Sequence, residues 1–197
     1  MTDLMVVVTH FGAMVLLAPF ALLVAAWLWY AAGTREAFLW CCCVAGVGIV
    51  TALAKIYFAA CDLRLIDVHS PSGHSAFAAI AYGGFTVVAM SGSHSLRARL
   101  FRVGTALWVL LIGISRVVVK AHTPGEVIVG LAIGGIAVAV FALLYRGRAR
   151  PPYLLAGGIL LVVALVALSM PNQVFTLESW LHQVARMLLP YKTLICL

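Results

Sequence analysis

Two short polar stretches, residues 71–74 and 115–126, hold most of the side chains in this chain that could do chemistry. Cationic side chains, hydroxyl groups and backbone N–H groups can together bind the oxygens of a multiply charged anion such as phosphate. Phosphate transfer also needs a nucleophile and an acid, and two histidines can supply both. The candidates for binding phosphate are Lys55, Arg64, Ser72, Gly73 and Arg116, and those for catalysis are His122, His74 and Glu126.

Glu126 has two interpretations. It follows His122 by four residues, so its carboxylate could hold that imidazole in one tautomer and stabilise the cationic form, as the third group of a catalytic triad does. It also completes a capping box with Thr123, and Pro124 then occupies the first helical position. The cap is the simpler interpretation of the tetrapeptide alone, but the neighbouring histidine favours catalysis.

The residues around Gly73 are expected to start a helix. Backbone N–H groups there, together with the positive end of the helix dipole, would add to an anion site. A glycine at this position would let the backbone approach the anion closely. A zinc site built from the nearby histidines and Asp67 is disfavoured, because the three cations would oppose a divalent metal ion and attract an anion.

The composition predicts an all-α, polytopic membrane protein. Of 197 residues, 64% are hydrophobic and 10% are charged, and the mean hydropathy is +1.12. Several apolar runs reach the roughly 20 residues that cross a bilayer. The formal charge of +7 does not indicate nucleic-acid binding, because the basic residues lie between apolar runs, as topology signals do.

Six transmembrane helices are expected, and the chain is interpreted as one integral membrane domain, residues 1–197, with a catalytic core at about 50–130. Residues 1–10 are expected to lie at the surface. An amphipathic helix at about 172–189 is expected to lie in the membrane interface, as an anchor or a lid. The expected spans are about 11–32, 37–58, 75–91, 103–119, 124–145 and 153–170.

Arginines indicate how the chain is oriented. The loops after the first, third and fifth spans share one side and carry Arg35, then Arg97, Arg99 and Arg102, then Arg146, Arg148 and Arg150. The positive-inside rule makes that side cytoplasmic. Both termini and both polar stretches then face outward, which in a bacterium means the periplasmic side of the inner membrane.

The two stretches resemble the motifs of the type 2 phosphatidic acid phosphatase superfamily, which includes membrane lipid phosphatases and soluble vanadium haloperoxidases. Its Pro-Ser-Gly-His motif is present at residues 71–74, and its Ser-Arg-x5-His-x3-Asp motif is present at residues 115–126 with Glu126 in place of Asp. The Lys-x6-Arg-Pro motif matches poorly: Lys55 fits, but Arg64 lies two residues late and is followed by Leu65.

The resemblance implies that His122 forms a phosphohistidine, that His74 serves as acid and then base, and that no metal takes part. The expected substrate is a lipid phosphate or diphosphate whose tail stays among the membrane lipids, such as undecaprenyl diphosphate, phosphatidate, phosphatidylglycerol phosphate or lipid A. A phosphotransferase that passes the phosphoryl group to a lipid acceptor remains open. A transporter is disfavoured, because the ionisable groups gather at one face rather than at mid-span.

Overall fold

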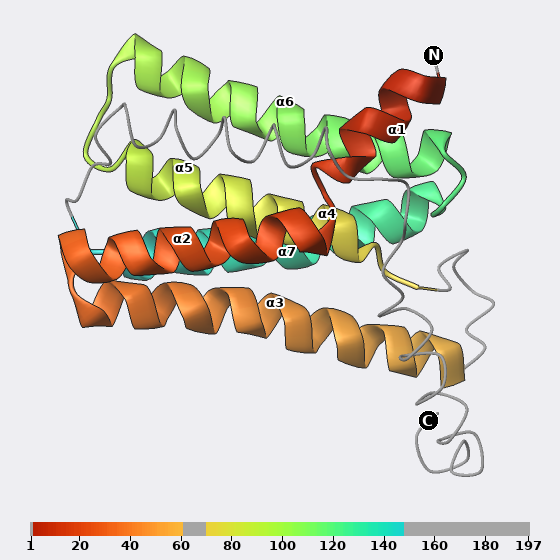
Figure 1. Cartoon of the computed structure of the whole chain (residues 1–197), viewed down its shortest axis with the longest axis horizontal. Helices are drawn as coiled ribbons and strands as arrows, with labels where there is room; N and C mark the ends of the chain where they lie inside the picture. Colours follow the sequence, from red (N-terminus) through yellow and green to blue (C-terminus); the bar gives the residue numbers. More distant parts are fainter. Residues whose placement is uncertain (1, 61–69, 148–197) are drawn as a thin grey trace.

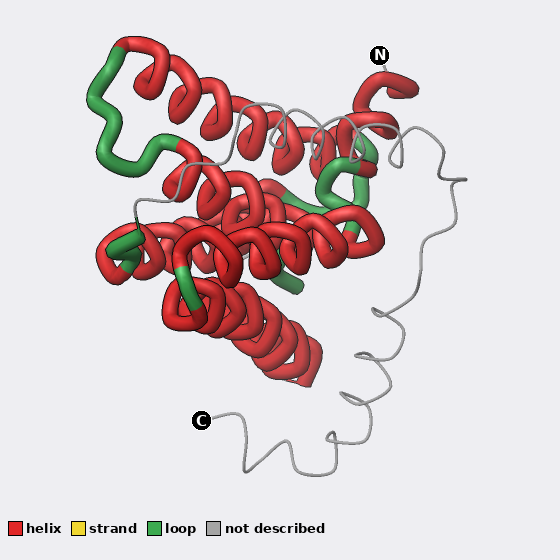
Figure 2. The backbone as a smooth tube through the Cα atoms, turned by 60° about the vertical axis from the view of Figure 1, so that its left-hand side comes forward, coloured by secondary structure: helices red, strands yellow, loops and turns green. Residues whose placement is uncertain are grey.

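The computed structural model describes residues 2–60 and 70–147 of the chain. This described part is a helical bundle (Figures 1 and 2). The helices are α1 (Thr2–His10), α2 (Met14–Ala32), α3 (Thr34–Ala60), α4 (Gly73–Ala78), the π-helical turn η1 (Ala79–Gly83), α5 (Gly84–Ala89), α6 (Leu96–Val118) and α7 (Pro124–Leu144).

The segment α4–η1–α5 forms the centre of the bundle. It runs between α6 on one side and α2 and α3 on the other (Figure 1), and α7, which lies behind α2 in this view, packs against α4 and η1. Most of its side chains are buried, and they are small near the start of the segment, where Ala76 and Ala78 are fully enclosed. Small residues let neighbouring helices approach closely, which explains why this segment can be surrounded by so many others.

Four of the described helices, α2, α3, α6 and α7, are long and apolar enough to cross a membrane. They indicate an integral membrane protein. The expected third span corresponds to residues 73–89, which are helical throughout but divided by η1, so that no single piece of it reaches that length. The expected sixth span and the expected amphipathic helix lie outside the described residues.

Residues 2–10, which were expected to lie at the surface, are helical and partly buried. They form helix α1, which packs against α6 and buries Val8 and Thr9. The polar pair Thr9-His10 interrupts an apolar run, as residues at a membrane interface do. Nothing in the neighbouring sequence indicates that the Thr9 side chain contacts Arg116, far along the chain.

The start of the fourth span was also predicted wrongly. Helix α6 begins at Leu96, so that Arg97, Arg99 and Arg102 lie in its first turns rather than in a loop. Ser95 caps the helix by accepting a hydrogen bond from the N–H of Ala98 at 3.2 Å, and arginine is a good helix former. The second span, expected from about residue 37, likewise begins earlier, because α3 begins at Thr34.

The loops after the first, third and fifth spans were expected to lie on the same side, and contacts among the described residues confirm this. Arg35, at the start of α3, donates to the carbonyl oxygen of Leu144 at 3.2 Å. The hydroxyl of Ser91, after α5, donates to the carbonyl oxygen of Gly147 at 3.1 Å. These contacts place the start of α3, the residues after α5 and the end of α7 together at one end of the bundle, and the α6–α7 connection lies at the other end (Figure 1).

Candidate active site

His122 and Glu126 form the best-defined part of the candidate site. The Nδ1 atom of His122 lies 2.7 Å from Oε2 of Glu126, and the two side chains are only 5% and 7% exposed. The backbone N–H of His122 donates to the carbonyl oxygen of Arg116 at 3.2 Å, which ties the loop to the end of α6. Because Nδ1 faces the carboxylate, the imidazole is oriented with Nε2 as its remaining nitrogen.

Glu126 caps its helix and also contacts the histidine. The capping box is present: Thr123 Oγ1 accepts from the N–H of Glu126 at 3.3 Å, and Glu126 Oε2 accepts from the N–H of Thr123 at 3.1 Å. The other oxygen, Oε1, accepts from the N–H of Ser70 at 2.8 Å. The two interpretations of Glu126 are therefore compatible, because one carboxylate makes all of these contacts.

The stretch 70–74 is fixed to the first turns of α7. The N–H of Ser72 donates to the carbonyl oxygen of Glu126 at 3.0 Å, and Ser70 contacts the Glu126 side chain. Gly130, one turn further along α7, permits this approach, because a Cβ there would collide with the carbonyl oxygen of Ser72. The two polar stretches, which lie far apart in the sequence, are thereby held together.

Hydrogen bonds within the protein already use part of the donor set expected at the start of α4. Ser72 is the N-cap of α4 and is fully buried. Its Oγ accepts from the N–H of Ser75 at 3.4 Å and from the hydroxyl of Ser75 at 3.0 Å. Its own N–H is bound to Glu126. Gly73 has ample space, since a Cβ there would meet only the Thr51 methyl at an ordinary 3.9 Å.

Two cations lie near the histidine. Burial lowers the pKa of His122 below its ordinary value of 6.5, and the positive charges of Arg116 and Lys55 lower it further, while the hydrogen bond and the charge of Glu126 act in the opposite direction. Both cations are therefore close enough to act electrostatically on the imidazole. The net direction favours a neutral histidine, the form that can act as a nucleophile.

The structure thus brings six of the eight predicted site residues into one region through contacts or charge: Lys55, Ser72, Gly73, Arg116, His122 and Glu126. His74 follows Gly73 directly in α4 and lies against Gly12, which precedes α2. Arg64 lies outside the described residues. The sequence reasoning missed Thr9, whose Oγ1 accepts a hydrogen bond from Nη1 of Arg116 at 3.0 Å.

Comparison with protein-family models gives a match to the PAP2 superfamily over residues 63–150. This part of the chain is therefore similar to the PAP2 superfamily. The match confirms the expected family and contains both polar stretches, whereas Lys55 lies just before it. Neither the curated proteins nor the solved structures gave a match to the chain. Similarity to the PAP2 superfamily supports a phosphatase or phosphotransferase type of activity.

Proposed function

We propose that this protein is a metal-independent phosphatase that hydrolyses a lipid phosphate or diphosphate through a phosphohistidine. The observation that carries the proposal is the contact of 2.7 Å between His122 Nδ1 and Glu126 Oε2. With Nδ1–H donated to the carboxylate, Nε2 holds a lone pair for attack on phosphorus. The charges of Lys55 and Arg116, which act on this imidazole, are also suited to neutralising the phosphate oxygens.

The proposed reaction has two steps. In the first, Nε2 of His122 bonds to phosphorus while the bond from phosphorus to the leaving oxygen breaks, and His74 gives that oxygen a proton. In the second, water attacks the phosphohistidine, His74 takes a proton from the water, and inorganic phosphate leaves as the P–N bond breaks. Glu126 stabilises the imidazole as it gains positive charge, as the carboxylate does in a triad. Lys55, Arg64, Ser72, Gly73 and Arg116 would hold the phosphate oxygens.

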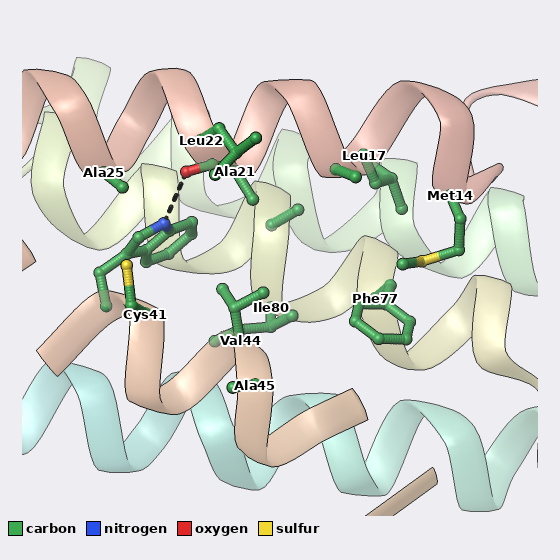
Figure 3. Close-up of a pocket in the computed structure, with 13 residues that line it drawn as sticks. Met14, Leu17, Ala21, Leu22, Ala25, Cys41, Val44, Ala45, Phe77 and Ile80 are labelled. Atoms are coloured by element: carbon green, nitrogen blue, oxygen red, sulfur yellow. Dashed lines mark hydrogen bonds between the residues drawn. The ribbon is translucent and has the colours of Figure 1, made fainter. Parts of the chain in front are cut away.

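An apolar groove between α2, α3 and the central segment supports a lipid substrate. It encloses about 330 Å³ and is lined almost wholly by apolar side chains (Figure 3). Its polar neighbour, the Trp40 indole N–H, is satisfied by the carbonyl oxygen of Ala21 at 2.9 Å. The lining residues include Met14, Ala18, Ala25, Val44, Ala45 and Phe77.

The groove begins beside the proposed acid. Phe77 lies one helical turn after His74, and Met14 lies two residues after Gly12, where a Cβ would be 3.2 Å from His74 Cβ. The groove-lining stretch from Met14 to Ala25 is roughly 16 Å long at about 1.5 Å per residue. A tail lying in this groove would place its phosphate at the end where the polar residues gather, so we propose that the groove accepts the substrate tail.

Filling the groove tests this placement. Ala18 is an exposed residue of α2 that lines the groove, and Ala18→Phe should raise KM for a long-tailed lipid phosphate about tenfold by excluding the tail. The rate with a short, water-soluble phosphate ester should not change. Ala139→Phe is the matched control, since Ala139 is exposed on α7 and does not line the groove. Equal effects on both substrates would count against a tail site.

The pH dependence of catalysis should reflect the lowered pKa of His122. Nucleophilic attack needs the neutral imidazole, so the acidic limb of kcat/KM should lie below pH 6.5. Lys55→Gln removes a charge that lowers this pKa, and it should therefore move the limb to higher pH as well as weaken phosphate binding. Comparing the two profiles with one substrate cancels the ionisation of the substrate itself. A limb that stays in place, or moves to lower pH, contradicts the assignment.

The direct test is phosphate release by the purified protein in detergent with EDTA present. We would supply undecaprenyl diphosphate, phosphatidate, phosphatidylglycerol phosphate and lipid A separately, and our preference is for undecaprenyl diphosphate. Release of inorganic phosphate in EDTA supports the proposal and identifies the substrate. Consumption of a substrate without inorganic phosphate would instead indicate transfer to a lipid acceptor. If none of these substrates is consumed, the result counts against both the phosphatase and the phosphotransferase.

We also propose that the site faces the periplasm from a bacterial inner membrane. The support is the arginine-rich end of the bundle, where Arg35 and Arg102 bind carbonyl oxygens of neighbouring segments, opposite the end that carries His122. By the positive-inside rule the arginine-rich end would be cytoplasmic. Labelling a cysteine introduced at exposed Lys120 with a membrane-impermeant reagent in intact cells tests this orientation.

A further inference from the structure

The N-terminal helix and the turn that follows it are firmly attached to the site end of the bundle. The Tyr82 hydroxyl, on η1, donates to the carbonyl oxygen of Phe11 at 2.9 Å. The ring of Phe11 lies edge-on against Trp108 of α6, with centroids 5.2 Å apart. Backbone hydrogen bonds from Phe11, Gly12 and the next residue close the turn. The turn is therefore held by both the central segment and α6.

One side chain of α1 contacts a proposed phosphate-binding residue. Thr9 is 8% exposed, and its Oγ1 accepts from Nη1 of Arg116 at 3.0 Å across 107 residues of sequence. A guanidinium is planar, so fixing one of its nitrogens also fixes the plane in which the others can reach phosphate oxygens. A hydrogen bond to a charged group also contributes more than one between neutral groups.

The same turn touches the proposed general acid. Gly12 is buried, and a Cβ added there would lie 2.8 Å from Ile112 Cγ2 and 3.2 Å and 3.3 Å from Cβ and Cδ2 of His74. Any larger residue would therefore have to move the histidine or the isoleucine. The absence of a side chain at Gly12 sets where the His74 ring can lie.

We infer that the segment Thr9–Gly12 is a positioning element of the active site, in which Thr9 orients Arg116 toward phosphate and Gly12 sets the place of His74. The inference rests on the proposed function, since it assigns Thr9 a role in the same phosphate site. Thr9 is a positioning residue rather than a catalytic one, because it would act on the substrate only through the guanidinium of Arg116.

The experiment compares Thr9→Val with Thr9→Ser, which differ in whether the hydroxyl is kept. Two quantities are measured for each: kcat/KM for the best lipid phosphate, and the inhibition constant of inorganic phosphate. Thr9→Val should weaken phosphate inhibition and lower kcat/KM by about tenfold or more, whereas Thr9→Ser should stay within about twofold to threefold of the wild type. In an Arg116→Lys background, which lacks Nη1, Thr9→Val should add little, as coupled residues do in a double-mutant cycle.

The turn itself is tested with Gly12→Ala and two soluble esters, phenyl phosphate and p-nitrophenyl phosphate. If the general acid is displaced, kcat should fall more for phenyl phosphate, whose phenolate is the poorer leaving group, than for p-nitrophenyl phosphate. The ratio of the two kcat values should therefore change, while the inhibition constant of phosphate should not. Thermal unfolding of each variant shows whether the fold persists.

Failure of this inference can be told apart from failure of the proposed function. If the wild type hydrolyses the lipid and Thr9→Val binds phosphate as tightly as the wild type, the positioning role is wrong while the function stands. The same conclusion follows if Thr9→Ser loses as much as Thr9→Val, or if Thr9→Val costs as much in the Arg116→Lys background. If the wild type neither binds phosphate nor hydrolyses any substrate, the proposed function itself fails.

Discussion

Replacing His122 with alanine should reduce phosphate release to the background rate. A nucleophile that works with an acid and an orienting carboxylate cannot be substituted by the remaining groups, and removing such a residue costs roughly a million-fold in kcat. The imidazole is held by Glu126 through Nδ1 and by Arg116 through its backbone, so no other described side chain can take over the position of its Nε2 atom. Initial rates of phosphate release measure the loss.

A labelling experiment identifies the nucleophile independently of the rate. The wild type, denatured during turnover of a substrate with labelled phosphorus, should carry an acid-labile label that His122→Ala lacks. His94→Ala is the matched control, because His94 is exposed in the loop before α6, at the opposite end of the bundle. Full activity in His122→Ala, or a label that persists in it, would refute the phosphohistidine mechanism.

The convergence of the two polar stretches could be predicted from the sequence, because it depends on counting spans. A loop after the second span and a loop after the fourth must emerge at the same end of a helical bundle. The hydrogen bonds from Ser70 and Ser72 to Glu126 confirm this juxtaposition. The two motifs are compact in sequence, so residue type and spacing alone were enough to name His122, Glu126 and Ser72 as candidates.

Other features depend on contacts that no local pattern records. Thr9 is polar and ends an apolar run, which also fits an interfacial residue, and only the fold places Arg116 beside it. Gly12 resembles an ordinary turn glycine until His74 is seen against it. The arginines of α6 were assigned to a loop because their charge suggested the end of a membrane span. Ser95 caps α6 before these arginines, so the helix begins outside the apolar region.

Replacing Glu126 with glutamine should lower kcat by roughly 1,000-fold to 10,000-fold, as the corresponding carboxylate-to-amide change does in a catalytic triad. Glutamine keeps the size of the side chain, and its amide oxygen can still accept from the N–H of Thr123 or of Ser70. It loses the charge that stabilises the imidazole as the phosphoryl group is transferred. Glu126→Asp keeps that charge, and we expect it to remain active. Steady-state kinetics with one lipid phosphate compare the variants.

Thr123→Ala separates the catalytic role of Glu126 from its role as a cap. It removes the Oγ1 atom that accepts from the N–H of Glu126 at 3.3 Å but leaves the carboxylate and its contact with His122. Loss of the cap should cost about 1 kcal/mol of stability with little change in kcat, whereas Glu126→Gln should change kcat far more than stability. If both variants lose activity to the same extent, Glu126 acts only by starting α7. Different losses would mean that one carboxylate both caps the helix and holds the nucleophile.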